Sequence, residues 1–260
     1  MSWTCHGSSN SSMVAALKRA GLIHNPEVEA AMLAVDRGLF VPPGQSPYQD
    51  SPQLLGFGAT ISAPHMHAAC VELLRAQIKP GARVLDVGSG SGYLTLIFAH
   101  LANRGPGARV VGVEHIKELV DASHQSTAAI PWAQQMMRDD ALRLLKGDGY
   151  AGFAEWAPFD AIHVGAAAPA VPPVLVDQLA PGGRLVVPVG PEGGPQQLVV
   201  LDKDMAGRVS TWNEMGVMYV PLTTEEAQRG KAALMAAFKK GPSPGDLDGC
   251  EMGRSRSPGR

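Results

Sequence analysis

The 260-residue sequence lacks several features that would each indicate a particular class of protein. It has only three cysteines, and their spacing fits neither a metal site nor a redox pair, so we expect reduced thiols at Cys5, Cys70 and Cys250. No apolar run approaches the roughly 18 residues of a membrane-spanning helix, and no charged-then-apolar secretion signal begins the sequence. The formal net charge of −2 gives no broad attraction to nucleic acid or anionic lipid. We therefore expect a cytosolic protein with neither nucleic-acid nor membrane partners.

A glycine-rich turn lies between two apolar segments in residues 82–100. Residues 84–87 are typical of a buried strand, and the residues from Tyr93 onward are typical of a buried helix. The turn between them, GSGSG at 88–92, lets the backbone bend and approach a ligand. A dinucleotide fingerprint counted from Gly88 requires a third glycine at position 93, where this chain has tyrosine. The spacing therefore argues against a pyrophosphate ligand.

Two acidic residues stand at the ends of the strands beside this turn. Asp86 lies near the end of the first strand, and Glu114 follows the second, residues 109–113. A carboxylate in the position of Glu114 can accept hydrogen bonds from both hydroxyls of a ribose, so the two acids are expected to bracket an adenosine. The alternative is an ordinary turn whose glycines serve packing. The order of strand, turn, helix, strand and acid favours the ligand site.

The rest of the chain alternates strands with helices, which predicts a doubly wound, mostly parallel α/β sheet with ligands at its carboxyl edge. Asp148, between two glycines after the third strand, either forms a plain turn or faces an adenine. Ser62 precedes a helix at 64–78, and its local pattern favours a helix cap. Further strands are expected at 141–146, 159–165 and 184–189, and an antiparallel hairpin is expected at 197–202 and 217–220. Further helices are expected at 11–20, from residue 25, and at 117–129, 174–179 and 231–240. Residues 47–58 and 130–140 show no periodicity and are expected to have no regular structure.

The domain boundaries are expected from the same pattern. Residues 1–10 are small and polar, which favours a flexible N-terminus, and residues 11–229 form one domain with a helical segment at its start. Residues 230–260 are expected to form a largely disordered tail, because its end is rich in Gly, Pro, Ser and charge.

Seven segments together resemble the protein-L-isoaspartate (D-aspartate) O-methyltransferases, and the animal form especially. The resemblance spans roughly residues 13–228. GSGSG alone fits any class I methyltransferase of Rossmann-like fold, whereas the segments at 59–67 and 160–169 are much more specific to this family. The segments are DSPQ (50–53), ATISAPHMH (59–67), LDVGSGSG (85–92), HIKELV (115–120), DAIHVGAAAP (160–169), PGGRL (181–185) and VMYVPLT (217–223).

The resemblance implies an enzyme that transfers a methyl group from S-adenosyl-L-methionine and releases S-adenosyl-L-homocysteine. The acceptor would be the free carboxylate of an L-isoaspartyl or D-aspartyl residue in a damaged protein or peptide. Such a carboxylate is ionised at pH 7, because its pKa lies near ~4, and needs no general base. Alignment of the reacting groups would supply most of the catalysis, and no metal site is implied.

The resemblance also assigns roles to residues. Ser62 would be catalytic and orient the substrate carboxylate, in place of the helix cap that the local pattern favours. The cofactor would be held by Leu55, Gly56, Phe57, Gly58, Ser62, His65, Asp86, Gly88, Ser89, Gly90, Gly92, Glu114, His115, Asp148, Gly149, Thr223 and Gln228. The substrate would contact Ser62, Ala63, His67, Val217, Tyr219 and Val220, with the strand at 217–220 offering backbone groups to an extended peptide.

The chain departs from the animal pattern at several positions. Tyr150 replaces the usual arginine beside the adenine, Glu114 replaces aspartate, Gly58 stands where glutamine is common, and the ending after Gln228 is unrelated. An adaptor that binds a partner through this divergent tail is therefore an alternative function. A small-molecule or RNA methyltransferase is another, although the chain has no basic stripe or aromatic platform for RNA. The enzyme is expected to be a monomer.

Overall fold

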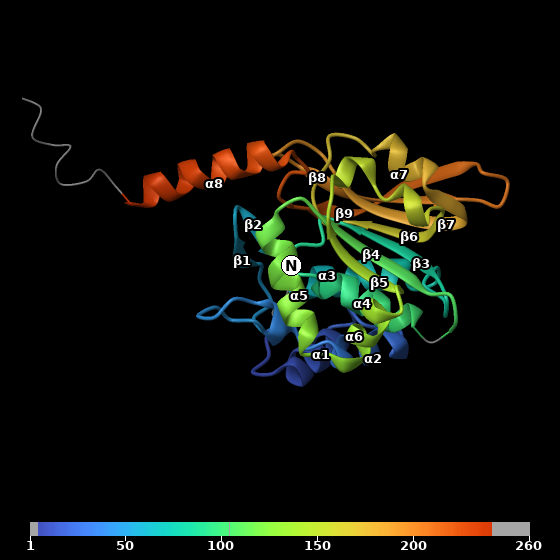
Figure 1. Ribbon diagram of the computed structural model, residues 1–260, viewed down its shortest axis with the longest axis horizontal. Coiled ribbons are helices and arrows are strands. Elements are labelled where there is room, and N and C mark those ends of the chain that lie inside the picture. Colours follow the sequence, from blue (N-terminus) through green and yellow to red (C-terminus); the bar gives the residue numbers. More distant parts are fainter. Residues whose placement is uncertain (1–4, 104, 241–260) are drawn as a thin grey trace, which may run out of the picture.

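A seven-stranded sheet lies between two layers of helices in the computed structural model, which describes residues 5–103 and 105–240 (Figure 1). Within this sheet, the first five strands are parallel and the last two antiparallel, as the sequence predicts. The strand order is β5-β4-β3-β6-β7-β8-β9. The strands are β3 (Arg83–Val87), β4 (Arg109–Glu114), β5 (Leu142–Lys146), β6 (Phe159–Val164), β7 (Leu179–Val189), β8 (Gln196–Lys203) and β9 (Val209–Val217).

The direction in which strands are added reverses at β3, which pairs with β4 on one side and β6 on the other. Ligands of open α/β sheets bind at such a switch point, outside the carboxyl ends of the strands. The three apolar residues of β3 are all buried because they alternate between two cores. Val84 packs into the core under one face of the sheet, and Leu85 and Val87 into the core under the other.

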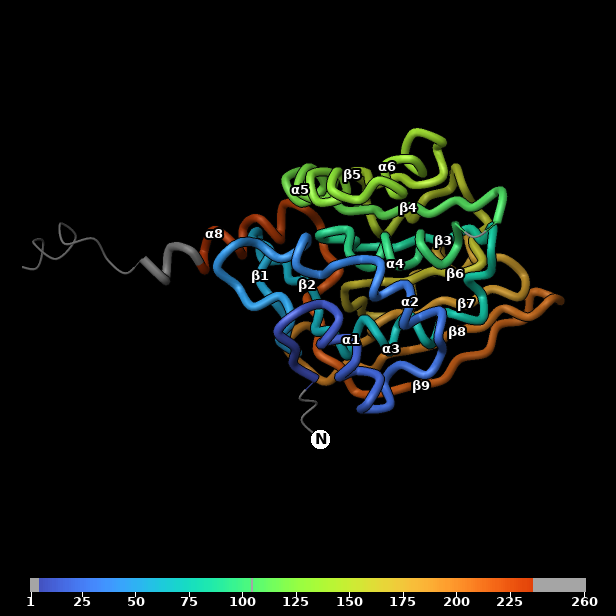
Figure 2. The backbone as a smooth tube through the Cα atoms, turned by 90° about the horizontal axis from the view of Figure 1, so that it is seen from below, coloured from blue at the N-terminus to red at the C-terminus, as the bar shows by residue number. Residues whose placement is uncertain are grey.

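The helices divide unequally between the two faces of the sheet (Figures 1 and 2). The face with more helices carries α1 (Asn10–Arg19), α2 (Pro26–Ala34), α3 (Pro64–Leu74), α4 (Tyr93–Ala102), α5 (Lys117–Ala128), α6 (Pro131–Arg138) and the 3₁₀ turn η1 (Arg37–Phe40). The other face carries α7 (Pro173–Asp177) and the 3₁₀ turns η2 (Gly149–Ala151) and η3 (Ala154–Trp156). Helix α8 (Glu225–Lys240) projects away from the carboxyl edge of the sheet (Figure 2).

Three expectations about secondary structure are wrong. Within the loop expected at 47–58, a hairpin begins, formed by β1 (Gln53–Gly56) and β2 (Ala59–Ile61). Helix α6 occupies most of 130–140. The second hairpin strand is β9, at Val209–Val217 instead of 217–220. The sequence pattern does not indicate this strand, because its residues are mostly exposed and carry no apolar run.

Helix boundaries also differ from the sequence pattern. The cap of α3 is Ala63, which makes no side-chain cap bond, so the Ser62 cap is wrong and the helix ends at Leu74 rather than 78. Ser9 caps α1, one turn earlier than expected, while Asn25 caps α2 as its sequence indicates.

The chain ends differ in part from the expected domain boundaries. A flexible segment is expected at 1–10, but within it Cys5 is buried and Asn10 begins α1, so residues 5–10 are not flexible throughout. Helix α8 passes through the expected boundary at 229, and the helix expected at 231–240 is its second half. Disorder expected for 241–260, and the thiol of Cys250, fall outside the described residues.

The core between α4 and the sheet should dominate the stability of the fold. Leu96 is fully buried there, so Leu96→Ala should lower the free energy of unfolding by about 2–5 kcal/mol. Leu33→Ala is the matched control, because Leu33 is 45% exposed, and it should cost about 0.5 kcal/mol or less. Urea denaturation of both variants measures this, and equal losses would contradict the proposed core.

Candidate functional site

Two glycines meet where β3 and β6 end. Gly88 follows β3 with φ +71°, and Gly165 follows β6 and donates a backbone hydrogen bond to Val87 O at 2.8 Å. A Cβ on Gly165 would lie 2.9 Å from Gly88 O, closer than real Cβ contacts allow. Glycine at 165 therefore lets the two strand ends approach each other and leaves open space above them.

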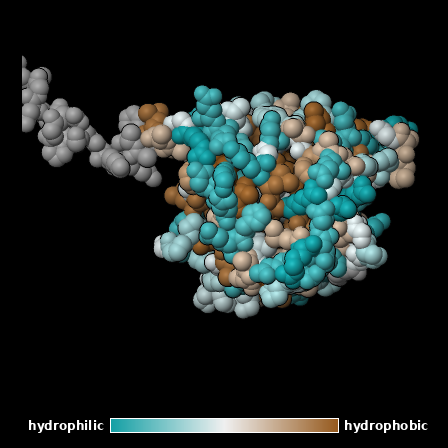
Figure 3. Space-filling view, in the orientation of Figure 1, coloured by the Kyte–Doolittle hydropathy of each residue, from teal (hydrophilic) through white to brown (hydrophobic). Residues whose placement is uncertain are grey.

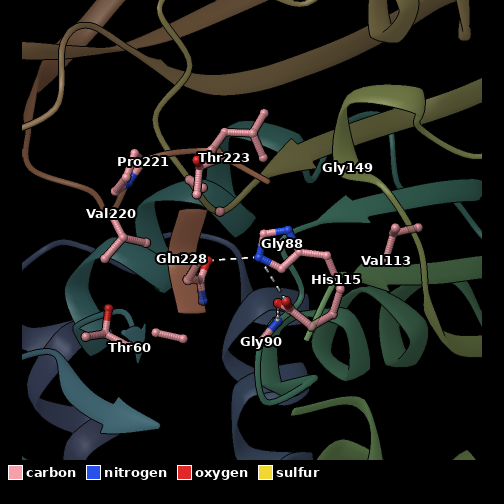
Figure 4. A pocket seen from close by; sticks show the side chains of 15 residues that line it. Thr60, Gly88, Gly90, Val113, His115, Gly149, Val220, Pro221, Thr223 and Gln228 are labelled. Carbon is pink, nitrogen blue, oxygen red and sulfur yellow. Dashed lines mark hydrogen bonds and ion pairs between the residues drawn. The ribbon is translucent and has the colours of Figure 1, made fainter. Parts of the chain in front are cut away.

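The first of three adjoining cavities lies over the ends of β3 and β4 (Figure 4). Glu114 forms one wall and is held there by two backbone donors, Gly90 N at 3.1 Å to Oε2 and Ile116 N at 3.0 Å to Oε1. Glu114 is 7% exposed. Its remaining lone pairs can accept hydrogen bonds from paired hydroxyls of a ligand.

Helix α8 covers one side of this cavity. Gln228 accepts a hydrogen bond from His115 Nε2 at 2.8 Å and donates one to Phe57 O at 3.0 Å, so it joins β4, α8 and the β1–β2 hairpin (Figure 4). The space-filling view, in the orientation of Figure 1, shows hydrophobic side chains at the centre of the molecule's near face, between hydrophilic ones (Figure 3). The cavity is lined by Ala59, Thr60, Gly88, Gly90, Val113, Glu114, His115, Gly149, Gly165, Ala166, Val220, Pro221, Leu222, Thr223 and Gln228.

The second cavity lies on the other side of the glycine turn and is more polar. Beneath it, Asp86 is 1% exposed and accepts hydrogen bonds from Thr95 Oγ1 and from His163 Nδ1, the latter at 2.8 Å. Burial alone would lower the pKa of His163, but hydrogen bonds to Asp86 and to Cys70 raise it to about 10. Asp86 and His163 are therefore a buried ion pair. The lining residues are Thr60, Ile61, Ser62, His67, Asp86, Gly88, Ser89, Gly90, Ser91, Tyr93, Leu94, His163 and Gly165.

The third cavity is an open groove of about 890 Å³ between α3 and the segment that follows β9. Ser62, Ala63, His65 and residues 216–221 line it, together with the loop after β7. His65 Nδ1 is 2.7 Å from the Asp50 carboxylate.

The backbone of Tyr219 is not available to a peptide in this groove. The buried amide of Gln196 accepts from Tyr219 N at 2.7 Å and donates to Tyr219 O at 3.2 Å. Val220 O accepts a hydrogen bond from Ala167 N. The expectation that a strand at 217–220 pairs with an extended substrate is therefore wrong for these groups. The Tyr219 hydroxyl instead points to Cys70 Sγ, at 3.9 Å, and to Ser62, and burial raises its pKa well above 10.

The three cavities meet at a few residues. Thr60 and Gly165 line all three, and Ser62 lines the second and the third. The first cavity, the polar second cavity and the open groove therefore adjoin one another at Thr60 and Gly165, and Ser62 stands between the second cavity and the groove. This arrangement can bring a bound small molecule against a larger substrate.

Most of the predicted site residues line these cavities, but several do not. Gly92 packs on α5, since a Cβ there would lie 3.1 Å from Ser123 Cβ. Asp148 caps η2 by accepting from Tyr150 N, while its neighbour Gly149 lines the first cavity. His65 lies on the groove instead of the first cavity. Leu55, Gly56, Phe57 and Gly58 form the β1–β2 hairpin tip, where Leu55 faces Gly90 and Phe57 faces Gln228.

Sequence reasoning missed Thr60, Gly165 and Gln196 as individual site residues. A glycine directly after a buried strand is a signal that could have identified Gly165. Gln196 gives no local signal, because its role depends on a contact 23 residues away. Tyr150, noted as a departure, donates its hydroxyl to Leu222 O at 3.0 Å and so fixes a segment of the cavity wall.

Comparison with known proteins gives a consistent result. Residues 8–227 match the family model described as Protein-L-isoaspartate(D-aspartate) O-methyltransferase. The chain is 52% identical to Protein-L-isoaspartate O-methyltransferase 1 of Arabidopsis thaliana, over 84% of this chain and 93% of the relative. It is 43% identical to Protein-L-isoaspartate O-methyltransferase of Caenorhabditis elegans, over 88% and 98%. A solved Plasmodium falciparum structure, described as such an enzyme in complex with S-adenosyl-L-homocysteine, superposes with a TM-score of 0.76 at 35% identity, over 84% and 99%.

The Asp86–His163 pair should make stability depend on pH. Since the pKa of His163 rises from 6.5 to about 10 on folding, the pair stabilises fully below pH 6.5 and its contribution is lost as pH rises through about 10. Asp86→Asn should therefore lower the free energy of unfolding by about 3–5 kcal/mol at pH 6.

Urea denaturation at pH 6 and pH 10 measures the effect. Asp121→Asn is the control, because its carboxylate pairs with Lys117 at an exposed position and should contribute less than about 1 kcal/mol. An Asp86→Asn loss of equal size at both pH values would show that His163 is not the charged partner.

Proposed function

The chain belongs to the protein-L-isoaspartate(D-aspartate) O-methyltransferase family, and we propose that its three converging cavities carry out that family's reaction. It is a protein repair enzyme that methylates the free carboxylate of isoaspartyl residues in damaged proteins and peptides. When bound, S-adenosylmethionine supplies an electrophilic methyl group on a cationic sulfur. The observation that carries the proposal is the meeting of the three cavities at Thr60 and Gly165, with Ser62 between the second cavity and the open groove.

The residues of the first two cavities fit S-adenosylmethionine. Glu114 would accept the ribose hydroxyls, because two backbone donors already fix its carboxylate at the cavity wall. Gly149 and Leu222 would contact the adenine, and the Gly88–Gly90 backbone would let the cofactor cross to the polar second cavity. S-adenosylmethionine carries no phosphate, which agrees with the tyrosine at position 93, where a dinucleotide fingerprint would require glycine.

The chain does not need to move a proton in this reaction. The acceptor carboxylate is ionised at pH 7, since carboxyl pKa values lie near ~4. Ser62 would donate a hydrogen bond to this carboxylate and orient one oxygen toward the neighbouring pocket. The work of the protein is then alignment, together with exclusion of water by Gln228 and the β1–β2 hairpin above the first cavity.

Substrate tolerance follows from the shape of the groove. It is open, and Gln196 already satisfies the backbone of Tyr219, so side chains of the groove and the junction carry recognition of the damaged residue. We propose that D-aspartyl residues are accepted at the same place. All three cavities are built from one chain, so we further propose that the enzyme acts as a monomer. We also propose that it acts in the cytosol. No helix among the described residues is long and apolar enough to cross a membrane.

Ser62→Ala should reduce methyl transfer to isoaspartyl peptides. Transfer of labelled methyl is measured on two peptides that differ only in L-isoaspartate or L-aspartate, and wild type should label the isoaspartyl peptide alone. Loss of one hydrogen bond to a charged group should lower kcat/KM by about 10- to 100-fold. Ser210→Ala, on exposed β9, is the control. Wild type that binds the cofactor but labels neither peptide would contradict the proposed function and favour an adaptor.

Glu114→Gln should weaken cofactor binding by about tenfold or more, because a neutral amide replaces the charged acceptor of the ribose hydroxyls. Calorimetry with S-adenosyl-L-homocysteine measures the dissociation constant. Glu155→Gln is the matched control, since Glu155 is exposed and pairs with Arg143 away from the cavities. An unchanged affinity in Glu114→Gln would place the ribose elsewhere.

A further inference from the structure

The Tyr219 side chain joins the segment after β9 to α3. Gln196 holds the backbone of this residue at both N–H and C=O, so the position of the ring is fixed from outside the groove. The side chain is half-buried, and burial raises the pKa of its phenol well above 10, so the hydroxyl keeps its proton at physiological pH. Such a buried O–H needs an acceptor, because an unpaired one costs free energy.

Two neighbouring groups can interact with this hydroxyl. Cys70 Sγ, on the buried side of α3, lies 3.9 Å from the phenol oxygen, and the Ser62 side chain forms the other hydrogen bond. A thiol sulfur is a weak acceptor, whereas a hydroxyl oxygen is a good one. Tyr219 therefore donates its hydrogen to Ser62 Oγ, and its oxygen is left to accept from the Cys70 thiol.

The buried ion pair below the second cavity gives the same direction. Asp86 is 1% exposed, and a carboxylate buried to this degree needs a cation beside it, which is the His163 ring at 2.8 Å. A charged imidazole ring has an N–H at both nitrogens and can accept at neither. Its Nδ1–H is donated to Asp86, so the hydrogen bond between His163 and Cys70 runs from Nε2–H to Sγ. The S–H of Cys70 is then free for Tyr219.

Ser62 stands at the end of this series of donors, between the second cavity and the groove. Its oxygen accepts from Tyr219, and no further partner of the Ser62 hydroxyl is found among the described residues. The hydrogen of Ser62 is thus left for a ligand. Hydrogen bonds that run in one direction also polarise one another, which makes the last hydroxyl a better donor.

We propose that Tyr219 is a positioning residue: its hydroxyl fixes Ser62 as a hydrogen-bond donor to the substrate carboxylate. This inference rests on the proposed function, which places that carboxylate beside Ser62. Tyr219 acts only through Ser62, because its own hydrogen is used within the protein. Without the phenol, the Ser62 hydroxyl rotates freely and donates to the carboxylate for only part of the time.

Tyr219→Phe removes the hydroxyl and keeps both the ring and the backbone hydrogen bonds to Gln196. It should lower kcat/KM for the isoaspartyl peptide by about 3- to 10-fold, as expected for one neutral hydrogen bond, with affinity for S-adenosyl-L-homocysteine unchanged. In the Ser62→Ala background, the same substitution should cause no further loss, because the two residues act as a unit.

Tyr48→Phe is the matched control for this substitution. Tyr48 is also half-buried, and its hydroxyl donates to Asp36 Oδ1 at 2.8 Å, away from the residues that line the three cavities. This variant should keep the kcat/KM of wild type. A fall in Tyr48→Phe as large as that in Tyr219→Phe would show that the loss reflects a weakened fold and would overturn the inference.

Peptide binding without turnover separates this inference from the proposed function. Calorimetry with the isoaspartyl peptide and S-adenosyl-L-homocysteine measures affinity where no methyl group can be transferred. Tyr219→Phe and Ser62→Ala should each weaken binding, and the double variant should bind as Ser62→Ala does. A Tyr219→Phe loss of equal factor with and without Ser62, or no loss at all, would contradict the positioning role. The expected binding pattern in a protein that transfers no methyl group would instead contradict the proposed function alone.

Discussion

The buried ion pair between Asp86 and His163 is the interaction on which the site depends. Asp86 on β3 and His163 on β6 are paired in register, and each lies two residues before the glycine that follows its strand. The pair fixes the spacing of the two strands at the switch point of the sheet. Gly88 and Gly165 can then touch, and the space above them divides into the three cavities.

This arrangement changes the role that a sequence motif suggests for Asp86. Its carboxylate is occupied by Thr95 and His163, so it holds the floor of the second cavity together. From this floor a chain of polar contacts continues through Cys70 and Tyr219 to Ser62. The serine at the junction is therefore connected to the sheet itself, which favours a fixed hydroxyl over a mobile one. Preorganised donors of this kind cost no rearrangement during a reaction.

The parts of the site that are local in sequence could be predicted, and the parts formed by long-range contacts could not. The turn at 88–92 and Glu114 follow from strand, glycine and acid patterns within thirty residues, and the structure places them on one cavity. The helix-cap role of Ser62 was a local interpretation, and it fails because Ala63 occupies the cap. The hold of Gln196 on Tyr219 depends on the pairing of β8 and β9, and the contact of Arg37 with His67 depends on how η1 packs on α3. Neither leaves a periodic signal in the sequence.

The most direct test of this account is a crystal structure of the full chain with S-adenosyl-L-homocysteine and an isoaspartyl peptide. The account predicts the ribose at Glu114, the peptide in the groove lined by Ala63 and Tyr219, and the isoaspartyl carboxylate against Ser62 Oγ. A peptide bound outside the groove, or a carboxylate that does not contact Ser62, would contradict it.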